Sequence, residues 1–290
     1  MKNYWFIGDI HGEISLLDKL LSAILKHDPR EITFVGDYID RGPHSRKVVD
    51  RIMELEVPVA CLMGNHELMM LSAYEDSAFG YNPMELWYWN GGEATLHSFG
   101  FSSFFNFQSQ MEDHYIQFFR SLLMSHVTEP GTGLRILATH AGVSPSIPVA
   151  DQLLLKDYQD LQQYIQDRQL NMEESFLWAR ETFFNSPARL WKGYMVVHGH
   201  TPTLKLKRFI QAGHYPNFHL VGNDLVIRRN GAHGDVVSVG IDSGSTISGR
   251  LTGLGIFVDQ GDGNGSSVSM RSLTVTREDI FPRDLGPIGP

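Results

Sequence analysis

The sequence predicts an α/β fold built on parallel strands, and two observations lead to this prediction. The first is an alternation of patterns: short apolar runs at residues 4–7 and 32–35 are each followed by apolar side chains at helical spacing. The second is a regular spacing. Polar residues follow these two runs and a third run at residues 57–63, and the polar residues Asp9, Asp37 and Asn65 are each 28 residues apart. Because one βαβ unit takes about 30 residues, we expect these three at the carboxyl ends of neighbouring parallel strands, where open α/β sheets bind ligands.

Three later apolar runs end in the same manner. These are residues 134–139, followed by His140; residues 194–197, followed by His198 and His200; and residues 236–241, followed by Asp242. A polar residue after one buried strand is commonplace. Six such strand ends in succession indicate a shared site.

Two insertions and a C-terminal segment complete the predicted organisation. The insertion at about 70–130 is rich in aromatic residues, and the one at about 151–190 is polar and predicted to be helical. We expect both to cap the site of a single domain that spans residues 1–290. Farther on, residues 262–265 (DGNG) lie between two apolar runs and predict a β-hairpin. The tail from residue 282, rich in Pro and Gly, is expected to be a frayed end.

Composition and charge narrow the class of protein. With 42% hydrophobic residues, the chain of 290 residues has enough apolar mass for a large core. Its one cysteine, Cys61, excludes an intramolecular disulfide and a zinc site made of cysteines, so we expect a cytoplasmic location. No apolar stretch is long enough for a membrane span or resembles a signal peptide, so no membrane partner is expected. The net charge of −9 opposes binding to a nucleic-acid scaffold, and we expect a monomer.

The residues that end the strands have the chemistry of metal ligands. Asp9 and His11 can face one centre where the chain leaves its strand, and Asp37 can share that centre from the next strand. Carboxylate and imidazole ligands together suit Mn, Fe or Zn. If Asp37 bridges, a second position can be completed by three later residues: Asn65, His140 and His200. Two divalent ions about 3.5–4 Å apart would activate water and hold a phosphoryl group.

Each cluster also has an ordinary explanation, because polar residues are common where a strand ends in a turn. Taken alone, Asp9 with His11, or His198 with His200, is explained better by turn residues than by a metal site. Residues 36–42 are more specific, since two carboxylates, an arginine and two glycines within seven residues have no packing rationale. Seven other histidines lack such neighbours and are expected to be surface or structural residues: His27, His97, His114, His126, His214, His219 and His233.

Five short motifs follow one another along the chain. They are residues 8–12 (GDIHG), 36–42 (GDYIDRG), 64–67 (GNHE), 140–145 (HAGVSP) and 199–202 (GHTP). Together they resemble the signature of the phosphoprotein phosphatase (PPP) group of calcineurin-like metallophosphoesterases. Its bacterial and phage-type serine/threonine phosphatase branch is similar also at residues 89–92 (WNGG), 177–180 (LWAR) and 241–244 (IDSG). The resemblance implies the α/β calcineurin-like metallophosphoesterase fold, in which β-sheets form a central sandwich flanked by helices, with cap insertions.

The resemblance also implies a role for each candidate residue. One metal ion would take Asp9, His11 and Asp37, and the other would take Asp37, Asn65, His140 and His200. His66 would be the general acid for the leaving oxygen, oriented by Asp40, while Arg41 and Arg180 would bind the phosphoryl oxygens. A hydroxide that bridges the two ions, manganese by preference and iron or zinc as alternatives, would attack phosphorus without forming a phosphoenzyme.

The substrate class stays open within this group. We favour phosphoserine and phosphothreonine proteins, with phosphotyrosine as a further substrate. The alternative is a symmetrical bis(5'-nucleosyl)-tetraphosphatase, which hydrolyses diadenosine tetraphosphate. Residues 140–142 (HAG) resemble that subgroup, and Trp87 and Trp89 could stack on adenine. A small apolar core of the cap explains these tryptophans better. A binding module with a decayed site is disfavoured, because every expected ligand and His66 are present.

Overall fold

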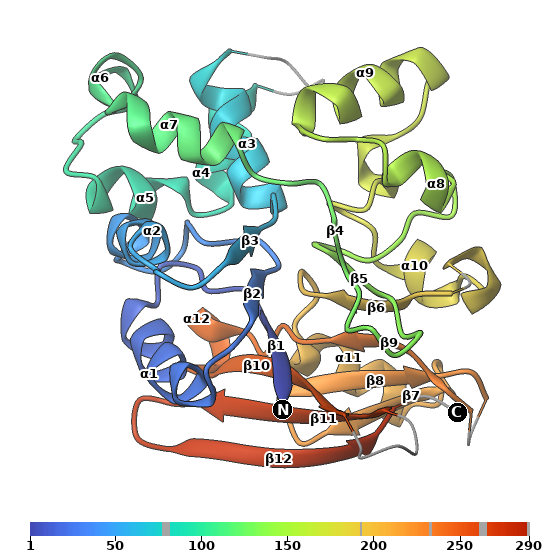
Figure 1. The fold of residues 1–290 in the computed structure, drawn as a ribbon. Helices are drawn as coiled ribbons and strands as arrows, with labels where there is room; N and C mark the ends of the chain where they lie inside the picture. Colours follow the sequence, from blue (N-terminus) through green and yellow to red (C-terminus); the bar gives the residue numbers. More distant parts are fainter. Residues whose placement is uncertain (77–81, 192, 232–233, 261–265, 289–290) are drawn as a thin grey trace.

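The computed structural model describes residues 1–76, 82–191, 193–231, 234–260 and 266–288. Within these residues the strands form two six-stranded sheets (Figure 1). In the first sheet, β1 (Lys2–Ile7), β2 (Glu31–Phe34) and β3 (Val59–Cys61) are parallel neighbours. The parallel arrangement that the 28-residue spacing predicts is therefore confirmed.

The C-terminal strands extend the first sheet on the other side of β1. β10 (Leu251–Gln260) pairs antiparallel with β1 and with β11 (Ser266–Val275). This confirms the predicted hairpin, whose turn at residues 261–265 lies outside the described residues. The expectation of a frayed tail is wrong: residues from Ile280 to Pro287 form β12, which pairs antiparallel with β11. Pro282 is compatible with a strand here because β12 is the edge strand among the described strands of this sheet, so one side of its backbone faces no further described strand.

The second sheet has the order β4-β5-β6-β9-β8-β7. Its three central strands, β5 (Ile136–Thr139), β6 (Met195–His198) and β9 (Val236–Gly240), are parallel. They are flanked by antiparallel strands: β4 (His126–Thr128), β8 (Leu225–Arg229) and β7 (Phe218–Val221). The six strand ends of the sequence pattern are thus divided equally between two sheets.

The two sheets pack face to face. A buried apolar cluster joins Phe6 and Leu254 of the first sheet to Ile136, Val197 and Val239 of the second. Two helices, α1 (Ile14–Ile24) and α2 (Ser45–Met53), share a buried apolar cluster with strands of the first sheet, and α11 (Thr203–Gln211) packs beside β7 of the second. The predicted α/β sandwich flanked by helices is confirmed.

The insertions are mainly helical, and in the view of Figure 1 most of their helices lie above the two sheets, with α10 beside β6. The first contains the second half of α3 (Asn65–Tyr74), then α4 (Pro83–Trp89), α5 (Gly92–Ser98), α6 (Phe104–Gln110) and α7 (Asp113–Arg120). The second contains α8 (Val149–Gln152), α9 (Tyr158–Arg168) and α10 (Glu181–Asn185), which confirms the helical prediction. Three short 3₁₀ helices, η1 (Leu25–His27), η2 (Met172–Glu174) and η3 (Ala188–Trp191), and α12 (Ser245–Ser248) complete the elements described. In the described part of the chain, none of the helices is both long and apolar enough to span a bilayer.

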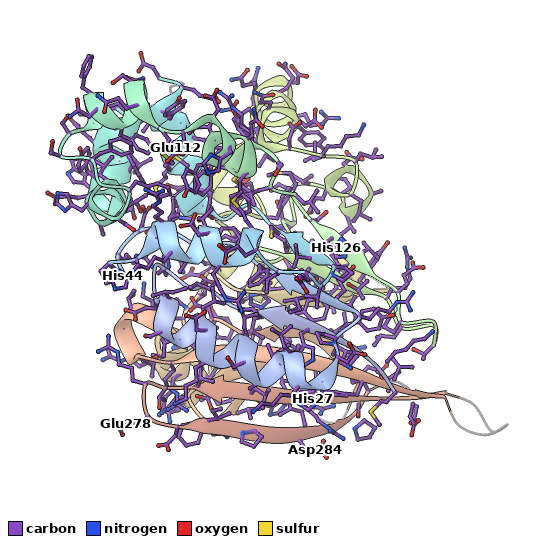
Figure 2. The ribbon with its side chains drawn as sticks, turned by 60° about the vertical axis from the view of Figure 1, so that its left-hand side comes forward. His27, His44, Glu112, His126, Glu278 and Asp284 are labelled. Carbon is purple, nitrogen blue, oxygen red and sulfur yellow. The ribbon has the colours of Figure 1, made fainter. Side chains whose placement is uncertain are left out.

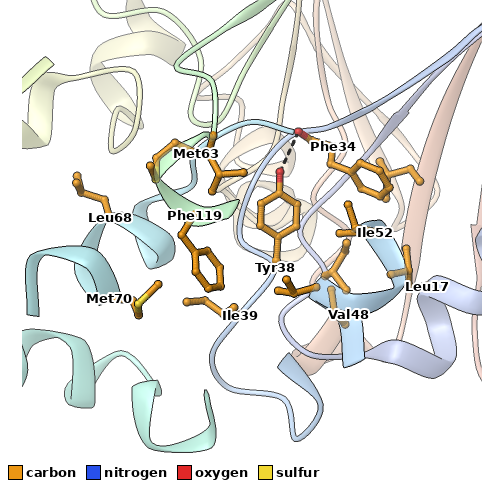
Figure 3. Close-up of a cluster of buried hydrophobic side chains, with 14 of the residues drawn as sticks. Leu17, Phe34, Tyr38, Ile39, Val48, Ile52, Met63, Leu68, Met70 and Phe119 are labelled. Carbon is orange, nitrogen blue, oxygen red and sulfur yellow. Dashed lines mark hydrogen bonds between the residues drawn. The ribbon is translucent and has the colours of Figure 1, made fainter. Parts of the chain in front are cut away.

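A buried aromatic residue anchors the loop that leaves β2. Tyr38 lies among apolar side chains that include Phe34, Met63 and Phe119 (Figure 3). Its hydroxyl lies 2.8 Å from the carbonyl of Leu62 and 3.4 Å from that of Phe34, so it ties the loop to two neighbouring strands. Asp37 and Asp40, which flank Tyr38 and Ile39, are therefore held against a packed core.

Candidate active site

The carboxyl ends of the parallel strands in both sheets meet at one place. Asp37, which follows β2, lies between them: its Oδ2 is 3.5 Å from Nε2 of His11, and its Oδ1 is 3.4 Å from Nε2 of His140. His11 follows β1 of the first sheet, and His140 follows β5 of the second. The single sheet edge expected from the strand pattern is in fact a junction of two sheets, and Asp37 joins them.

Two groups of possible ligand atoms surround Asp37. One contains His11, Asp37 and His66, and the other contains Asp37, His140 and His200, with the ligand atoms of each group within 4.8 Å of one another. Asn65 belongs beside the second group, because its Oδ1 lies 3.0 Å from Nε2 of His140 and 2.8 Å from Nδ1 of His200.

Asp9 joins the two sheets at a different point. It is not part of either group of three; its carboxylate accepts the backbone N–H of His200 at 2.9 Å. Gly199 permits this approach, since a Cβ at that position would collide with Oδ1 of Asp9. The structure thus places Asp9 beside His200, and coordination of a metal ion by either residue stays a prediction.

The residues present fit divalent cations. Burial lowers the pKa of His11 to about 3, and burial together with His140 holds the pKa of His200 well below its usual range. Both imidazoles are consequently neutral near pH 7, which is the form that binds a metal. Nε2 of His200 is also buried without a hydrogen-bond partner among the described residues. Imidazole nitrogens and carboxylate or amide oxygens gathered in this way form a suitable donor set for Mn, Fe or Zn.

Backbone strain is concentrated at the site. Of the eight non-glycine residues with positive φ in the described chain, five are predicted site residues: His11, Asp37, Asp40, Arg41 and His200. Left-handed backbone is costly for such residues and persists where the surroundings enforce it. One enforcing residue is Glu67, whose buried carboxylate accepts the backbone N–H groups of residues 37, 38, 39 and 64 at 2.8 to 3.2 Å. Sequence reasoning missed this role of Glu67, although its third place in helix α3, after Gly64, is a known capping position.

His66 and Asp40 form the expected pair. Nδ1 of His66 lies 2.7 Å from Oδ2 of Asp40, and both side chains are fully buried. Because an ionised carboxylate only accepts, Nδ1 is the donor in this hydrogen bond. Two further donors to Asp40 were not expected: Trp87 Nε1 at 3.0 Å and Thr95 Oγ1 at 2.6 Å.

The two tryptophans proposed for adenine stacking lie in very different surroundings. Trp87 is fully buried and bonded to Asp40, so its ring is not available to a nucleotide base. The interpretation of Trp87 as part of a cap core is confirmed, and the stacking interpretation of Trp87 is wrong. Trp89 is 77% exposed, so the interpretation as part of a cap core is wrong for Trp89.

Both predicted phosphate-binding arginines lie at the site. Arg41 is within hydrogen-bond distance of Nε2 of His11 at 2.7 Å and of Nε2 of His66 at 2.8 Å. Arg180 precedes α10 and donates from Nη1 to the carbonyl of His200 and to Thr201 Oγ1, at 3.2 and 3.0 Å. Among the described residues, Arg180 forms no ion pair with an acidic side chain, and its hydrogen-bond partners are both in the loop that contains His200.

A second carboxylate acts on Asp9, that of Asp242, for which no role at the site was predicted. Burial raises the pKa of Asp242 to about 6, and Asp242 in turn contributes, after burial, to a raised pKa of Asp9. Its Oδ1 accepts the backbone N–H of Gly244 at 2.8 Å. The place of Asp242 after the last parallel strand was the signal that could have included it in the site.

The histidines set aside in the sequence lie elsewhere. Figure 2 shows His27 and His126 well apart from each other on the ribbon. His27 packs its ring against Trp5, and His126 bonds to Glu31 at 3.0 Å. His233 lies outside the described residues.

The fold is a two-sheet α/β sandwich, and Asp, Asn and His side chains suited to binding metal ions come together where its strand ends meet. A family model described as calcineurin-like phosphoesterase matches residues 2–232. The chain therefore belongs to the calcineurin-like phosphoesterase family of hydrolases, whose members use a centre of two divalent metal ions.

Three curated relatives match shorter segments. The zinc-dependent endopolyphosphatase of Saccharomyces cerevisiae is 36% identical over 80 residues, 27% of this chain and 24% of that protein. The symmetrical bis(5'-nucleosyl)-tetraphosphatase of Bordetella pertussis is 38% identical over 74 residues, 25% of this chain and 27% of that protein. Serine/threonine-protein phosphatase 1 of Salmonella typhimurium is 37% identical over 94 residues, 32% of this chain and 40% of that protein. Each match thus covers less than half of the relative's length.

Proposed function

We propose that the protein is a phosphomonoesterase that removes phosphate from phosphoserine and phosphothreonine in proteins, with phosphotyrosine as a further substrate. The observation that carries the proposal is the place of Asp37, whose two oxygens face His11 on one side and His140 on the other. A carboxylate in this position can be shared by two metal ions. Beside it stand a buried histidine–carboxylate pair and two arginines, which suit a phosphoryl group and its leaving oxygen.

In this proposal two ions, manganese by preference and iron or zinc as alternatives, are held by the predicted ligands. These are Asp9, His11 and Asp37 for one ion, and Asp37, Asn65, His140 and His200 for the other. When bound, such ions acidify a water molecule and draw charge from the phosphoryl oxygens. Burial in neutral form keeps the histidines ready to ligate, because no proton has to leave them first.

The chain's own side chains then act on the two ends of the phosphate ester. His66, whose Nδ1 is bonded to Asp40, has Nε2 on the opposite edge of its ring and can give a proton from there to the leaving oxygen. Arg41 and Arg180 provide planar guanidinium groups for the phosphoryl oxygens. Arg180 is already oriented, since one of its nitrogens is fixed by His200 and Thr201.

Hydrolysis of diadenosine tetraphosphate is the second candidate. It is supported by the relative from Bordetella pertussis and by the exposed ring of Trp89, but no longer by Trp87. We propose in addition that the protein acts as a cytoplasmic monomer without a nucleic-acid or membrane partner.

The experiment that tests the proposal compares turnover of p-nitrophenyl phosphate, a phosphoserine peptide and diadenosine tetraphosphate, with manganese supplied in excess. We expect release of inorganic phosphate from the first two substrates and a higher kcat/KM for the peptide than for diadenosine tetraphosphate. The reverse preference would replace the proposal with the second candidate. Absence of metal-dependent turnover on all three would contradict both.

A further inference from the structure

We propose that Thr95, a residue of the first insertion, is a positioning residue for proton transfer by His66. Together with Trp87 it fixes the carboxylate of Asp40, and Asp40 fixes the ring of His66. The inference rests on the general-acid role that the proposed function gives to His66. It deepens that function by assigning a catalytic purpose to a segment expected only to cap the site.

The first support is the arrangement of donors around Asp40. Its Oδ2 lies 2.7 Å from Nδ1 of His66, and its Oδ1 accepts from Thr95 Oγ1 at 2.6 Å. The indole N–H of Trp87 is shared between the two oxygens at 3.0 and 3.1 Å. Asp40 and Trp87 are completely buried and Thr95 is 1% exposed, so water does not compete for these bonds. Rotation of the carboxylate would break contacts with three partners at once.

The second support is that Thr95 holds both the side chain and the backbone of Asp40. Its hydroxyl donates to the carboxylate and also accepts the backbone N–H of Asp40 at 2.9 Å. Asp40 has φ of 70°, a left-handed conformation that a non-glycine residue adopts only when its surroundings impose it. Ser45 assists, since its Oγ lies 3.1 Å from Thr95 Oγ1 and 3.2 Å from the same backbone N–H. A methyl group in place of the hydroxyl would lose the short bond to Oδ1.

The third support is the docking of the α4–α5 turn on the residue after Asp40. The carbonyl of Gly91 accepts the backbone N–H of Arg41 at 3.2 Å. Gly91 has φ of 101°, and a Cβ there would lie 2.9 Å from that nitrogen, so only glycine permits the contact. Arg41 in turn reaches Nε2 of His66 at 2.8 Å. The same turn therefore holds the residues that contact both nitrogens of the His66 ring.

These contacts define the proton-transfer step. In this step Arg41 donates to the phosphoryl oxygens and no longer to Nε2 of His66, and Nε2 carries a proton. The bond between phosphorus and the leaving oxygen breaks, and that oxygen keeps the bonding electron pair and takes this proton. The imidazole is left neutral, with its other proton still on Nδ1 and donated to Asp40. Asp40 takes no proton from His66 in this step, and its task is to keep Nε2 aimed at the leaving oxygen. Thr95 and Trp87 contribute by preventing the carboxylate from turning.

The test uses three threonine variants with manganese in excess. Thr95→Val keeps the shape of the side chain and removes the hydroxyl, and Thr95→Ser restores it. Thr33→Val is the matched control: Thr33 is 1% exposed, and its hydroxyl has no hydrogen-bond partner in the described part of the chain. For each protein, kcat and KM are measured with phenyl phosphate, whose leaving group needs a proton, and with p-nitrophenyl phosphate, whose leaving group needs little help. Bound metal is counted by elemental analysis.

We expect Thr95→Val to lower kcat for phenyl phosphate about tenfold, the loss typical of one hydrogen bond to a charged group. The loss should be several times smaller for p-nitrophenyl phosphate, with KM and metal content unchanged. Thr95→Ser should recover most of the phenyl phosphate activity, and Thr33→Val should match the wild type. Combined with His66→Asn, Thr95→Val should cause no further loss, because the residue that it positions is already absent.

Three results would overturn the inference. An equal loss on both substrates, or an additive loss in the double variant, would give Thr95 a purely structural role. An equal loss on both substrates in His66→Asn itself would remove the general acid and the inference with it, while metal-dependent turnover would still support the proposed function. If Thr95→Val does not fold, Trp87→Phe removes the other donor to Asp40 and the same outcomes apply.

Discussion

The two insertions reach the candidate site by different routes. The first contacts it through buried hydrogen bonds from Trp87 and Thr95 to Asp40, one step behind His66. The second contacts it directly: Arg180 donates to the His200 carbonyl, and the ring of Trp178 lies edge to face with that of His200 at 6.2 Å. The first sheet and its insertion thus surround the candidate proton donor, and the second sheet and its insertion surround the second group of ligands. Asp37 belongs to both halves.

Asp37→Ala should have the largest effect, because it removes the residue that the two halves share. We expect nearly all turnover to be lost for every phosphate ester. Asp167→Ala is the control, because Asp167 is exposed in α9, and this variant should hydrolyse the phosphate esters as fast as the wild type. Substantial activity in Asp37→Ala would show that the two halves do not depend on a common carboxylate.

His66→Asn should damage only the half that handles the leaving group. General acid catalysis is typically worth about 10²- to 10⁴-fold, and we expect a loss in this range for phenyl phosphate with bound metal retained. The loss for p-nitrophenyl phosphate should be much smaller. Because His66 also lies in one of the two groups of ligand atoms, a loss of metal in this variant would identify it as a ligand instead of an acid.

Arg180→Ala should damage the other half, with a smaller effect. One hydrogen bond to a charged group corresponds to about 10- to 100-fold, and we expect a loss of this order in kcat/KM with a higher KM for every phosphate ester. Inhibition by inorganic phosphate should weaken as well. Arg180→Lys should keep only part of the wild-type kcat/KM, since the point charge of a lysine does not reproduce the two parallel donors of an arginine. Phosphate inhibition equal to that of the wild type would place Arg180 outside the phosphate site.

The smallest effect on turnover is expected at His198, which precedes Gly199 in the second half. Its ring packs edge to face on Phe183 at 5.1 Å, and burial lowers its pKa to about 4. In the unfolded chain the pKa of this histidine is near 6.5. Between pH 6.5 and 4 its ring is therefore protonated in the unfolded chain and neutral in the folded protein. Stability contributed by the neutral ring is therefore present above pH 6.5 and is lost as the pH falls, by up to roughly 3 kcal/mol.

This pH effect can be measured as urea unfolding free energies of the metal-free protein at pH 7 and pH 4.5. His198→Phe should reduce the decrease in stability between the two pH values. If the variant and the wild type lose equal stability on acidification, the charge state of His198 does not control it.

The strand ends were predictable because a βαβ unit has a characteristic length. The spacing of Asp9, Asp37 and Asn65 alone placed these residues at the ends of three parallel strands, as the pairing of β1, β2 and β3 confirms. The division into two sheets did not follow from spacing, since it depends on which strands pair side by side. β10, late in the chain, pairs with β1 at its start, and no local pattern reports such a contact.

The hydrogen-bond partners of Asp40 could not be predicted from the sequence for a similar reason. Trp87 and Thr95 are 47 and 55 residues from Asp40, and their contacts exist only once α4 and α5 fold over the loop after β2. The tail was mispredicted because Pro282 and Gly286 argue locally against a strand, whereas pairing with β11 decides the outcome. In both cases contacts between residues far apart in the sequence determine the structure, and the local sequence does not report them.

The measurement that tests the central claim most directly is the metal content of single-ligand variants from each half. Wild type, His11→Ala and His200→Ala would be loaded with manganese, desalted and analysed for bound metal. If the two halves each hold an ion and share Asp37, the wild type should carry two ions per chain, and each variant should carry one. One ion or none in the wild type, or the same content in all three proteins, would contradict a binuclear site divided between the two sheets.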